Sequence, residues 1–314
     1  MKRVSERAVP AVTLPRIPLG PDPELHTPLL PAQPLRVGQL RGLLTVMSGL
    51  DAGRVATIEG AAIVVGRDPE ADLWTEDPAV SRRHARFGHD PEGHVYVQDL
   101  ESTNGTFLHD RRVSIARLEP GDYVQLGGAL LVRFEFTDAT DEALRRQLYE
   151  SSVLDPLTRA YNRRYLAQRL GAEVAHALRT GAPLAALMLD LDHFKDFNDR
   201  HGHLAGDRAL RFVAAQVMRL IRAGDLLARY GGEEFVVVSR SAGDEALLLA
   251  ERLRSTVASM GFSVAGASTP VSVSIGVASL SELTAGEDPS ALVRRADERL
   301  YQAKLGGRNR VCGP

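Results

Sequence analysis

The chain has 314 residues, a formal net charge of −2 and one cysteine. This length is enough for two domains with their own cores, and the near-neutral charge gives no whole-chain argument for binding nucleic acid or a membrane surface. The single cysteine, Cys312, excludes a disulfide framework and a thiolate metal site, which suits a reducing cytosol. No run of about 18 apolar residues is present, and the basic N-terminus lacks the apolar segment of a secretory signal. We therefore expect a cytoplasmic protein without a membrane span.

Residues 1–36 contain prolines that are spaced too evenly for a helix or a central strand. We predict a disordered or polyproline-II-like tail here. Its composition is typical of a linker or leader, which is the simplest interpretation.

Residues 37–137 change to short β-type runs separated by turn residues, without helical periods between them. The expected strands cover residues 43–47, 55–58, 62–65, 84–87, 95–99, 123–126 and 130–136. Such a series predicts an all-β sandwich. Three polar clusters lie between the strands, where binding loops belong, at residues 66–67, 81–84 and 99–106.

Taken in order, these clusters resemble the forkhead-associated (FHA) domain, a phosphothreonine-reading sandwich. The resemblance implies that the Arg67 guanidinium and the Ser81 hydroxyl bind the phosphate, since a planar donor fork and a hydroxyl suit its oxygens. It also implies that Arg82 adds charge, that Thr103 belongs to the site, and that Asn104 hydrogen-bonds the ligand backbone. Scaffold roles would fall to His84, Gly105 and Thr106. The alternative is a structural sandwich whose arginines are only solvated.

The tail itself offers a ligand for such a domain. It contains two threonines, Thr13 and Thr27, and a phosphate on either would be tethered near Arg67 and Ser81 at an effective concentration on the order of millimolar. We therefore hypothesise that phosphorylated tail docks on the FHA loops, in cis or across a dimer, and alters the dimer geometry.

The spacing of apolar residues in 138–154 predicts a helix that has Leu144, Leu148 and Tyr149 on one side. The apolar stripe is short and leaves two interpretations, a dimerising signalling helix and a packed connector. We favour a connector that also takes part in dimerisation.

Residues 155–314 alternate strands and helices. One expected helix follows residues 155–164 and ends near residue 179, and the others cover residues 207–221, 244–259 and 289–305; the expected strands cover 187–190, 226–230, 235–239 and 271–277. This order predicts an α/β sheet covered by helices.

The segment Tyr230-Gly231-Gly232-Glu233-Glu234-Phe235 joins two apolar runs and predicts the tight turn of a β-hairpin. Two glycines leave the backbone open to a bulky substrate. Since side chains alternate along an extended chain, one of the two glutamates should face the site. Alone, such a turn is often merely solvated.

Further motifs stand in a fixed order around this hairpin: Asp190-Leu191-Asp192, Phe194-Lys195, Asn198-Asp199, Gly206-Asp207, Lys304 and Gly307-Arg308-Asn309. Together they resemble the GGDEF family, the diguanylate cyclases, across residues 155–314, in its GGEEF variant. The resemblance implies a palm-like sheet similar to that of nucleotidyl cyclases and polymerases. It also implies a homodimer in which two facing sites each hold one GTP and make cyclic di-GMP by symmetric attacks. The family commonly has glycine where Arg159 stands, a departure that concerns a turn.

The acidic residues define the expected metal site. Carboxylates brought together repel one another unless a cation lies between them, and such oxygens suit Mg²⁺ or Mn²⁺. By resemblance, the ligands are Asp190, the backbone carbonyl of Leu191, Glu233 and Glu234, with Glu234 acting as ligand or base. The metals would acidify the 3′-hydroxyl of one GTP and align it with the α-phosphorus of the other.

The expected substrate contacts also come from the resemblance. Asn198 and Asp207 match the guanine-reading pair, which would reject adenine because the polar atoms of the site would be left unpaired. The triphosphate contacts would be Lys195, Lys304 and Arg308, with backbone N–H groups around Phe194 and Lys195. Gly231 and Gly232 would lie against the substrate.

A separate regulatory site is expected at Arg222 and Asp225. Arg-x-x-Asp is the position of the family's product-inhibition site, where arginine can pair with guanine O6 and N7. Arg252 matches the secondary contact. The alternative is a capped turn after the preceding helix.

The sequence thus predicts a diguanylate cyclase that is regulated by FHA phosphothreonine recognition and by its product. The rival hypothesis is a catalytically inactive GGDEF-like receptor or FHA adaptor that binds cyclic di-GMP through Arg222 and Asp225. Because Asp190, Lys304, Arg308 and the GGEEF segment are all intact, we favour the enzyme.

Overall fold

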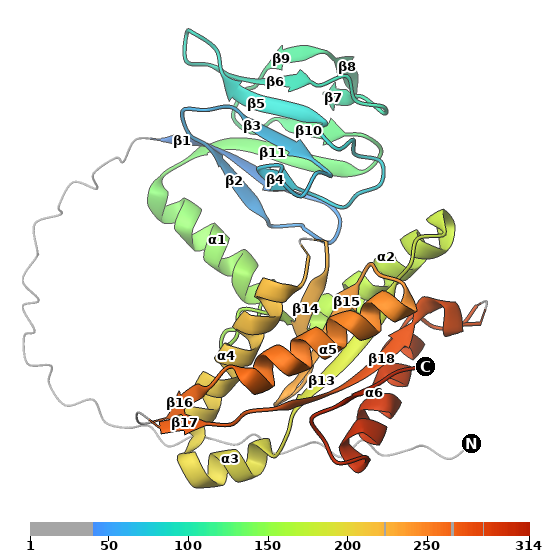
Figure 1. Cartoon of the computed structure of the whole chain (residues 1–314). Helices are drawn as coiled ribbons and strands as arrows, with labels where there is room; N and C mark the ends of the chain where they lie inside the picture. Colours follow the sequence, from blue (N-terminus) through green and yellow to red (C-terminus); the bar gives the residue numbers. More distant parts are fainter. Residues whose placement is uncertain (1–39, 223, 265–266, 285) are drawn as a thin grey trace, which may run out of the picture. The chain divides into compact units, whose positions relative to one another are not determined.

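The computed structural model describes residues 40–222, 224–264, 267–284 and 286–314. A β-sandwich comes first in these ranges, then a helix and an α/β domain (Figure 1). The predicted proline-rich tail, with Thr13 and Thr27, lies outside the described residues. None of the helices in the described ranges is both long enough and apolar enough to cross a bilayer.

The sandwich consists of one sheet with strand order β2-β1-β11-β10-β7-β8 and a second with strand order β4-β3-β5-β6-β9. Its strands are β1 (Arg41–Val46), β2 (Val55–Ile58), β3 (Ile63–Gly66), β4 (Leu73–Trp74), β5 (Ala85–His89), β6 (Val95–Asp99), β7 (Thr106–Leu108), β8 (Arg111–Val113), β9 (Ile115–Arg117), β10 (Tyr123–Leu126) and β11 (Leu130–Thr137). The sandwich prediction is confirmed. The sequence missed β4 and β7 to β9 because two or three residues are too few for an alternating pattern to show.

Both sheets contribute to the core of the sandwich. Leu44 and Phe134 of the first sheet and Phe87 and Val97 of the second are fully buried in one cluster. Burying each large apolar side chain contributes roughly 1.5–3 kcal/mol. The loops between the strands therefore start from a rigid base.

Helix α1 (Ala139–Val153) connects the two folds and begins where the sequence predicts. The Asp138 side chain caps it by accepting from the backbone N–H groups of residues 140 and 141, at 2.8 and 2.9 Å. Leu144 and Leu148 are exposed. Tyr149, the third residue of the predicted apolar stripe, is partly buried against the core of the α/β domain, so the stripe is open to solvent only at the two leucines.

The α/β domain has a central sheet with strand order β12-β14-β15-β13-β18-β19. Its elements are β12 (Tyr161–Asn162), α2 (Arg163–Thr180), β13 (Ala185–Leu191), α3 (Phe194–His201), α4 (His203–Leu220), β14 (Leu226–Arg229), β15 (Glu234–Ser239), α5 (Gly243–Ser259), β16 (Phe262–Val264), β17 (Ala267–Thr269), β18 (Val273–Ser279), the 3₁₀ helix η1 (Leu280–Glu282), α6 (Ser290–Leu305) and β19 (Val311–Cys312). The α/β prediction is confirmed. The sequence missed α3, the β16–β17 hairpin and the short edge strands.

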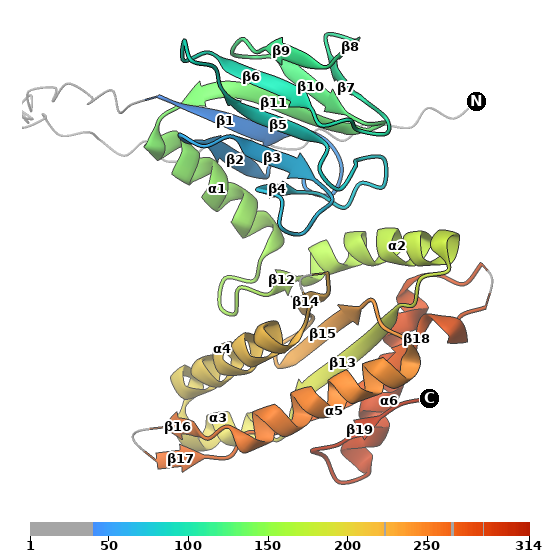
Figure 2. The ribbon, with the colours of Figure 1, turned by 45° about the horizontal axis from the view of Figure 1, so that its top comes forward.

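Helices cover both faces of this sheet (Figure 2). Strand β13 is buried along its whole length and pairs antiparallel with β15 and β18. Leu187 and Leu189 pack with α4 and α5, whereas Ala186 and Met188 pack with α2 and α6. This alternation is what a strand with two covered faces requires.

Two backbone positions show how tightly the domain is built. A Cβ on Gly276 of β18 would come within 2.0 Å of the Ala296 carbonyl oxygen of α6, so only glycine lets this helix lie directly on the strand. Arg159, at the turn where the GGDEF family commonly has glycine, has a φ of 63°, in the left-handed region.

His84 is a buried polar anchor of the sandwich, in agreement with its predicted scaffold role. Its side chain is 0% exposed. Its Nδ1 accepts from the Ser81 backbone N–H at 3.0 Å, so Nε2 carries the proton and donates to the Gly105 carbonyl oxygen at 3.1 Å. Burial lowers the pKa of His84, an effect that the Gly105 hydrogen bond partly opposes. The ring is therefore neutral in the folded protein.

We expect His84 to make the sandwich sensitive to acid. Between pH 7.5 and 5.5 the unfolded chain takes up a proton at this histidine and the folded chain does not, so the free energy of unfolding falls with pH. The loss is at most about 1.4 kcal/mol, the linkage value of one pKa unit. Trp74, the only tryptophan, reports the urea midpoint by fluorescence. The midpoint should fall less in His84→Gln than in the unaltered protein, and equal falls would contradict the assignment.

Candidate functional site

The acidic centre lies at the end of β13. Asp190 is 5% exposed, and its backbone is in register with Glu234 of β15. Lys304 of α6 places its Nζ 2.8 Å from Asp190 Oδ2. Burial raises the pKa of Asp190 to about 6; Lys304 opposes this through its hydrogen bond and charge, while Glu233 and Glu234 add to it. A buried carboxylate held beside two others requires a positive partner.

These residues fit a divalent cation by their chemistry. Asp190, Glu233 and Glu234 offer hard oxygen donors, and the Leu191 backbone N–H lies 3.4 Å from the Glu233 carbonyl oxygen, which brings the fourth predicted ligand beside them. The three carboxylates do not form a trio of ligand atoms within 4.8 Å of one another. Among the described residues such a trio occurs at Asp90, Glu92 and His94 of the sandwich surface.

The hairpin tip between β14 and β15 is as predicted, and two residues that the sequence analysis missed hold it. Arg229 Nη2 donates to the Gly232 carbonyl oxygen at 2.7 Å, and its Nη1 contacts Asp155 at 3.2 Å. A Cβ on Gly231 would come 2.5 Å from Glu234 Oε2. With any other residue at this position, the Glu234 carboxylate would have to move from where it lies. Only the position of Asp155 as the first residue of the expected domain and that of Arg229 directly before the hairpin tip could have indicated their role.

Helices α3 and α4 carry the predicted guanine pair. Asn198 Oδ1 is buried and has no hydrogen-bond partner among the described residues. A Cβ on Gly206 would come 1.8 Å from this oxygen, so glycine is what lets the Asn198 amide lie against α4, next to Asp207.

The predicted phosphate contacts come from two places. Lys195 is exposed on the first turn of α3, which starts from His193 in the left-handed region. Arg308 is exposed on the loop after α6. Lys304, predicted to contact phosphate, pairs with Asp190 in this structure. Lys304 thus contacts the acidic centre and is also the residue predicted to contact the triphosphate.

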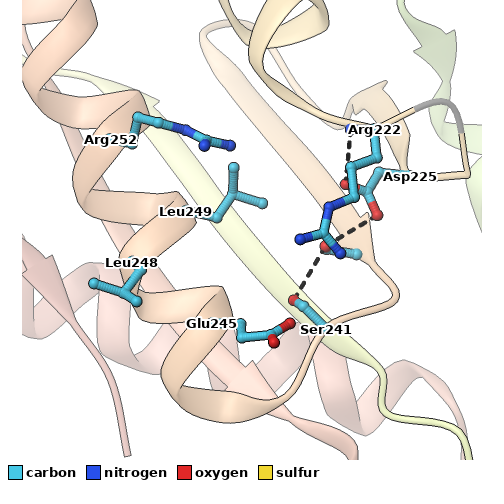
Figure 3. A pocket seen from close by; sticks show the side chains of 8 residues that line it. Arg222, Asp225, Ser241, Glu245, Leu248, Leu249 and Arg252 are labelled. Carbon is cyan, nitrogen blue, oxygen red and sulfur yellow. Dashed lines mark hydrogen bonds between the residues drawn. The ribbon is translucent and has the colours of Figure 1, made fainter.

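Arg222, Asp225 and Arg252 line one pocket of about 340 Å³ between the loop that follows α4, the end of β15 and helix α5 (Figure 3). Asp225 Oδ2 accepts from the Arg222 backbone N–H at 3.1 Å, and Oδ1 accepts from Ser239 Oγ at 3.0 Å. Arg252 Nη2 donates to the Leu220 carbonyl oxygen at 2.9 Å. The capped turn and the pocket therefore exist together. The sequence analysis did not identify the remaining lining residues, Ser239, Ser241, Glu245, Leu248 and Leu249.

The predicted phosphothreonine residues meet on the loops of the sandwich. Ser81 Oγ accepts from the Thr103 backbone N–H at 3.0 Å, and Asn104 Nδ2 donates to the Ala79 carbonyl oxygen at 2.8 Å. Arg67 is exposed, with its Nε donating to the Val80 carbonyl oxygen at 2.6 Å. Asn104 braces the loops in addition to its predicted ligand role. Arg82 is exposed beside Ser81.

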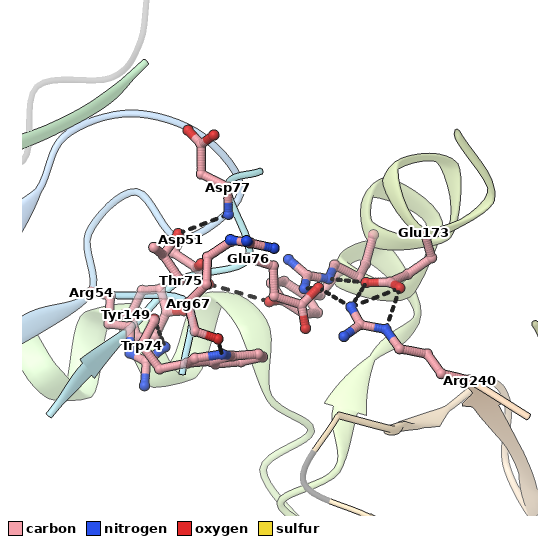
Figure 4. Close-up of polar contacts among 12 residues, drawn as sticks. Asp51, Arg54, Arg67, Trp74, Thr75, Glu76, Asp77, Tyr149, Glu173 and Arg240 are labelled. Carbon is pink, nitrogen blue, oxygen red and sulfur yellow. Dashed lines mark hydrogen bonds and ion pairs between the residues drawn. The ribbon is translucent and has the colours of Figure 1, made fainter. Parts of the chain in front are cut away.

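Strand β4 and the segment that follows it link these loops to the α/β domain (Figure 4). Trp74 Nε1 donates to the Arg67 carbonyl oxygen at 3.2 Å. Two residues further on, Glu76 accepts from Arg240 Nη2 at 2.7 Å and pairs with Arg169 of α2. Glu173, also buried in α2, binds the same two arginines. The sequence analysis assigned no role to this cluster.

Comparison with known proteins identifies both folds. Residues 152–310 match the family model described as diguanylate cyclase, GGDEF domain, and residues 63–127 match the FHA domain. The response regulator PleD of Caulobacter vibrioides is 42% identical over 182 residues, 58% of this chain and 40% of PleD. The diguanylate cyclase DosC of Escherichia coli is 42% identical over 239 residues, 73% of this chain and 50% of DosC.

One solved structure is similar at the level of the α/β domain. The coiled coil and GGDEF domain of DgcB from Caulobacter crescentus, in complex with c-di-GMP, is 33% identical with a TM-score of 0.51. The similarity covers 56% of this chain and 94% of that one. The chain spans half or less of the length of the curated relatives named above.

Proposed function

The chain belongs to the GGDEF family of diguanylate cyclases, and we propose that it condenses two GTP into cyclic di-GMP and two pyrophosphates. The observation that carries the proposal is the buried Asp190 carboxylate, with its raised pKa, at the GGEEF hairpin. A strongly perturbed carboxylate beside further acids and a lysine is typical of a catalytic centre.

The acidic residues at the end of β13 and at the hairpin are the proposed metal ligands. Asp190, Glu233, Glu234 and the Leu191 carbonyl would hold Mg²⁺ or Mn²⁺. When bound, the metal supplies charge neutralisation and a more acidic 3′-hydroxyl. Lys304, 2.8 Å from Asp190, limits the repulsion among the carboxylates.

Other residues bind and orient the substrate. Asn198 and Asp207 would select guanine, since a site built to hydrogen-bond that base leaves its polar atoms unpaired with adenine. Lys195 and Arg308 would bind the triphosphate from α3 and from the loop after α6.

The proposed active species is a homodimer. Each chain has one such centre and would hold one GTP, so two chains must face each other to join two nucleotides through two bonds. The exposed Leu144 and Leu148 of α1 support this arrangement, because a second copy can cover them.

We expect Glu233→Gln and Asp190→Asn to lower cyclic di-GMP formation at least about 100-fold, a loss of about 2.7 kcal/mol of transition-state stabilisation. The assay is chromatography of the products from GTP and Mg²⁺. Asp244→Asn, an exposed acid at the start of α5, is the matched control and should leave the rate unchanged.

The rival function is that of an inactive receptor or adaptor. The pocket at Arg222 favours this function because Asp190 does not line the pocket, so a ligand could bind there without an active catalytic centre. If the unaltered protein makes no cyclic di-GMP at high concentration but still binds it, the receptor hypothesis replaces the enzyme.

We further propose that this pocket is a product-inhibition site. Two arginines, Arg222 and Arg252, face a pocket of about 340 Å³ that also contains the Asp225 carboxylate. This combination matches a guanine base attached to a phosphodiester, since arginine pairs with guanine O6 and N7 as well as with phosphate.

Replacing Arg222 by alanine should therefore relieve inhibition. Losing a bidentate contact of about 1–3 kcal/mol raises the inhibition constant of cyclic di-GMP about 5- to 150-fold. Initial rates measured with added product give that constant. Arg219→Ala, an exposed arginine near the end of α4, is the control. Equal inhibition constants in the unaltered protein, Arg222→Ala and Arg219→Ala would show that the Arg222 segment is a turn without a role in product binding.

The FHA loops are proposed to bind phosphothreonine and to transmit that binding to the cyclase. Arg67, Ser81 and Thr103 lie on adjoining loops, which supports a phosphate site. The route to the cyclase runs through Trp74 and Glu76, because Glu76 binds Arg169 and Arg240 of the α/β domain.

Peptides from the tail, with phosphate on Thr13 or Thr27, are the probes for this site. Arg67→Ala should weaken the binding of a phosphorylated peptide about 10- to 150-fold, since a charge-assisted hydrogen bond is worth about 1.5–3 kcal/mol. Calorimetry measures the affinity, and Arg111→Ala, an exposed arginine of β8, is the control. If neither peptide binds better than its unphosphorylated copy, the ligand lies in another protein.

Glu76→Gln separates binding from transmission. Its carboxylate contacts Arg169 and Arg240, so this variant should bind the peptide as the unaltered protein does while its cyclase rate no longer responds. A full response in Glu76→Gln would exclude this route.

A further inference from the structure

The loop after α6 has an unusual backbone. Gly307, Arg308 and Asn309 follow one another with φ values of 113°, 62° and 43°. Non-glycine residues seldom adopt the left-handed region, although asparagine does so more readily than arginine. Arg308, the residue proposed to bind the triphosphate, thus has a backbone conformation that an arginine rarely adopts without neighbouring contacts.

Asp192 fixes this loop from the side of β13. Its Oδ2 accepts from the Asn309 backbone N–H at 3.0 Å and from Ser272 Oγ at 2.7 Å. Its Oδ1 accepts from Ser274 Oγ at 2.6 Å. Both oxygens of Asp192 therefore accept from neutral donors, whereas Asp190, two residues earlier, pairs with the charged Lys304.

Arg254 fixes the same loop from the side of α5. Its Nη1 donates to Asn309 Oδ1 at 2.7 Å. An ion pair with Glu251, one turn earlier, orients the guanidinium at 2.5 Å. Asn309 is thus held by its backbone N–H and by its side chain, from two different elements.

We propose that Asp192 and Arg254 are positioning residues for the nucleoside triphosphate. They hold Asn309, and through it Arg308, in the left-handed conformation that aims the Arg308 guanidinium at the phosphates. The inference rests on the proposed function, because it assigns Arg308 to a triphosphate. It predicts an effect on the binding of the phosphate tail and none on the binding of the base.

The test compares two nucleotides on the full chain. 3′-Deoxy-GTP binds without reacting, and GMP lacks the outer phosphates. Arg254→Ala and Asp192→Asn should weaken 3′-deoxy-GTP about 5- to 10-fold, as measured by calorimetry with Mg²⁺, and leave GMP unchanged. A role in fold stability alone would weaken both nucleotides together. Arg294→Ala, an exposed arginine of α6, is the control.

A double substitution decides whether the effect passes through Arg308. In an Arg308→Ala background, Arg254→Ala should have no further effect on 3′-deoxy-GTP, because the residue that it positions is gone. Additive losses would overturn the inference, as would an unchanged ratio of the two affinities in Arg254→Ala. Should Asp192→Asn fail to fold, Arg254→Ala still decides, since Arg254 lies near the surface. If the unaltered protein binds no 3′-deoxy-GTP, the proposed function fails instead.

Discussion

The arrangement of the α/β domain depends on one pair of charges, Asp190 and Lys304. A carboxylate at the end of a strand buried on both faces is costly unless a cation balances it. Lys304 can reach it only because α6 lies directly on β18, where Gly276 leaves no side chain between helix and strand. A single glycine more than 40 positions after the hairpin in the sequence thereby determines where the positive charge lies. The acidic centre is a product of packing as much as of its own residues.

The same dependence on close packing recurs at the other binding features. Gly206 gives Asn198 its place against α4, and Gly231 gives Glu234 its place at the hairpin tip. In each case a missing Cβ lets a polar group come where a larger residue would exclude it. The positions of these polar side chains therefore depend on neighbouring glycines, which have no side chain to take part in the chemistry.

Much of this could be read from the sequence, and the reasons are physical. The apolar runs at residues 187–189 and 235–238 predict strands because that signal is local, and the order of motifs indicates the site through the resemblance to a known family. Helix α3 and the first turn of α4 were missed because residues 194–206 are mostly polar, so no apolar period marks them, and Gly202, with a φ of 81°, separates the two helices. The partners of Asp192 and Glu76 were missed for another reason: they lie 117 and 164 positions away, and no periodicity reports such pairs.

Helix α5 contacts two of the proposed sites, the product pocket and the loop that carries Arg308, and it is one rigid element. Leu249, Ala250 and Leu253 bury it against the sheet, while Arg252 reaches the pocket and Arg254 reaches the loop of Arg308. Residues two apart on a helix point about 200° apart, so one helix can serve both sides. Any displacement of α5 caused by a ligand at Arg252 must either break the contact between Arg254 and Asn309 or move that loop with it. Product bound in the pocket and GTP bound at the hairpin would then act on a shared element, which is the physical condition for coupling between two sites.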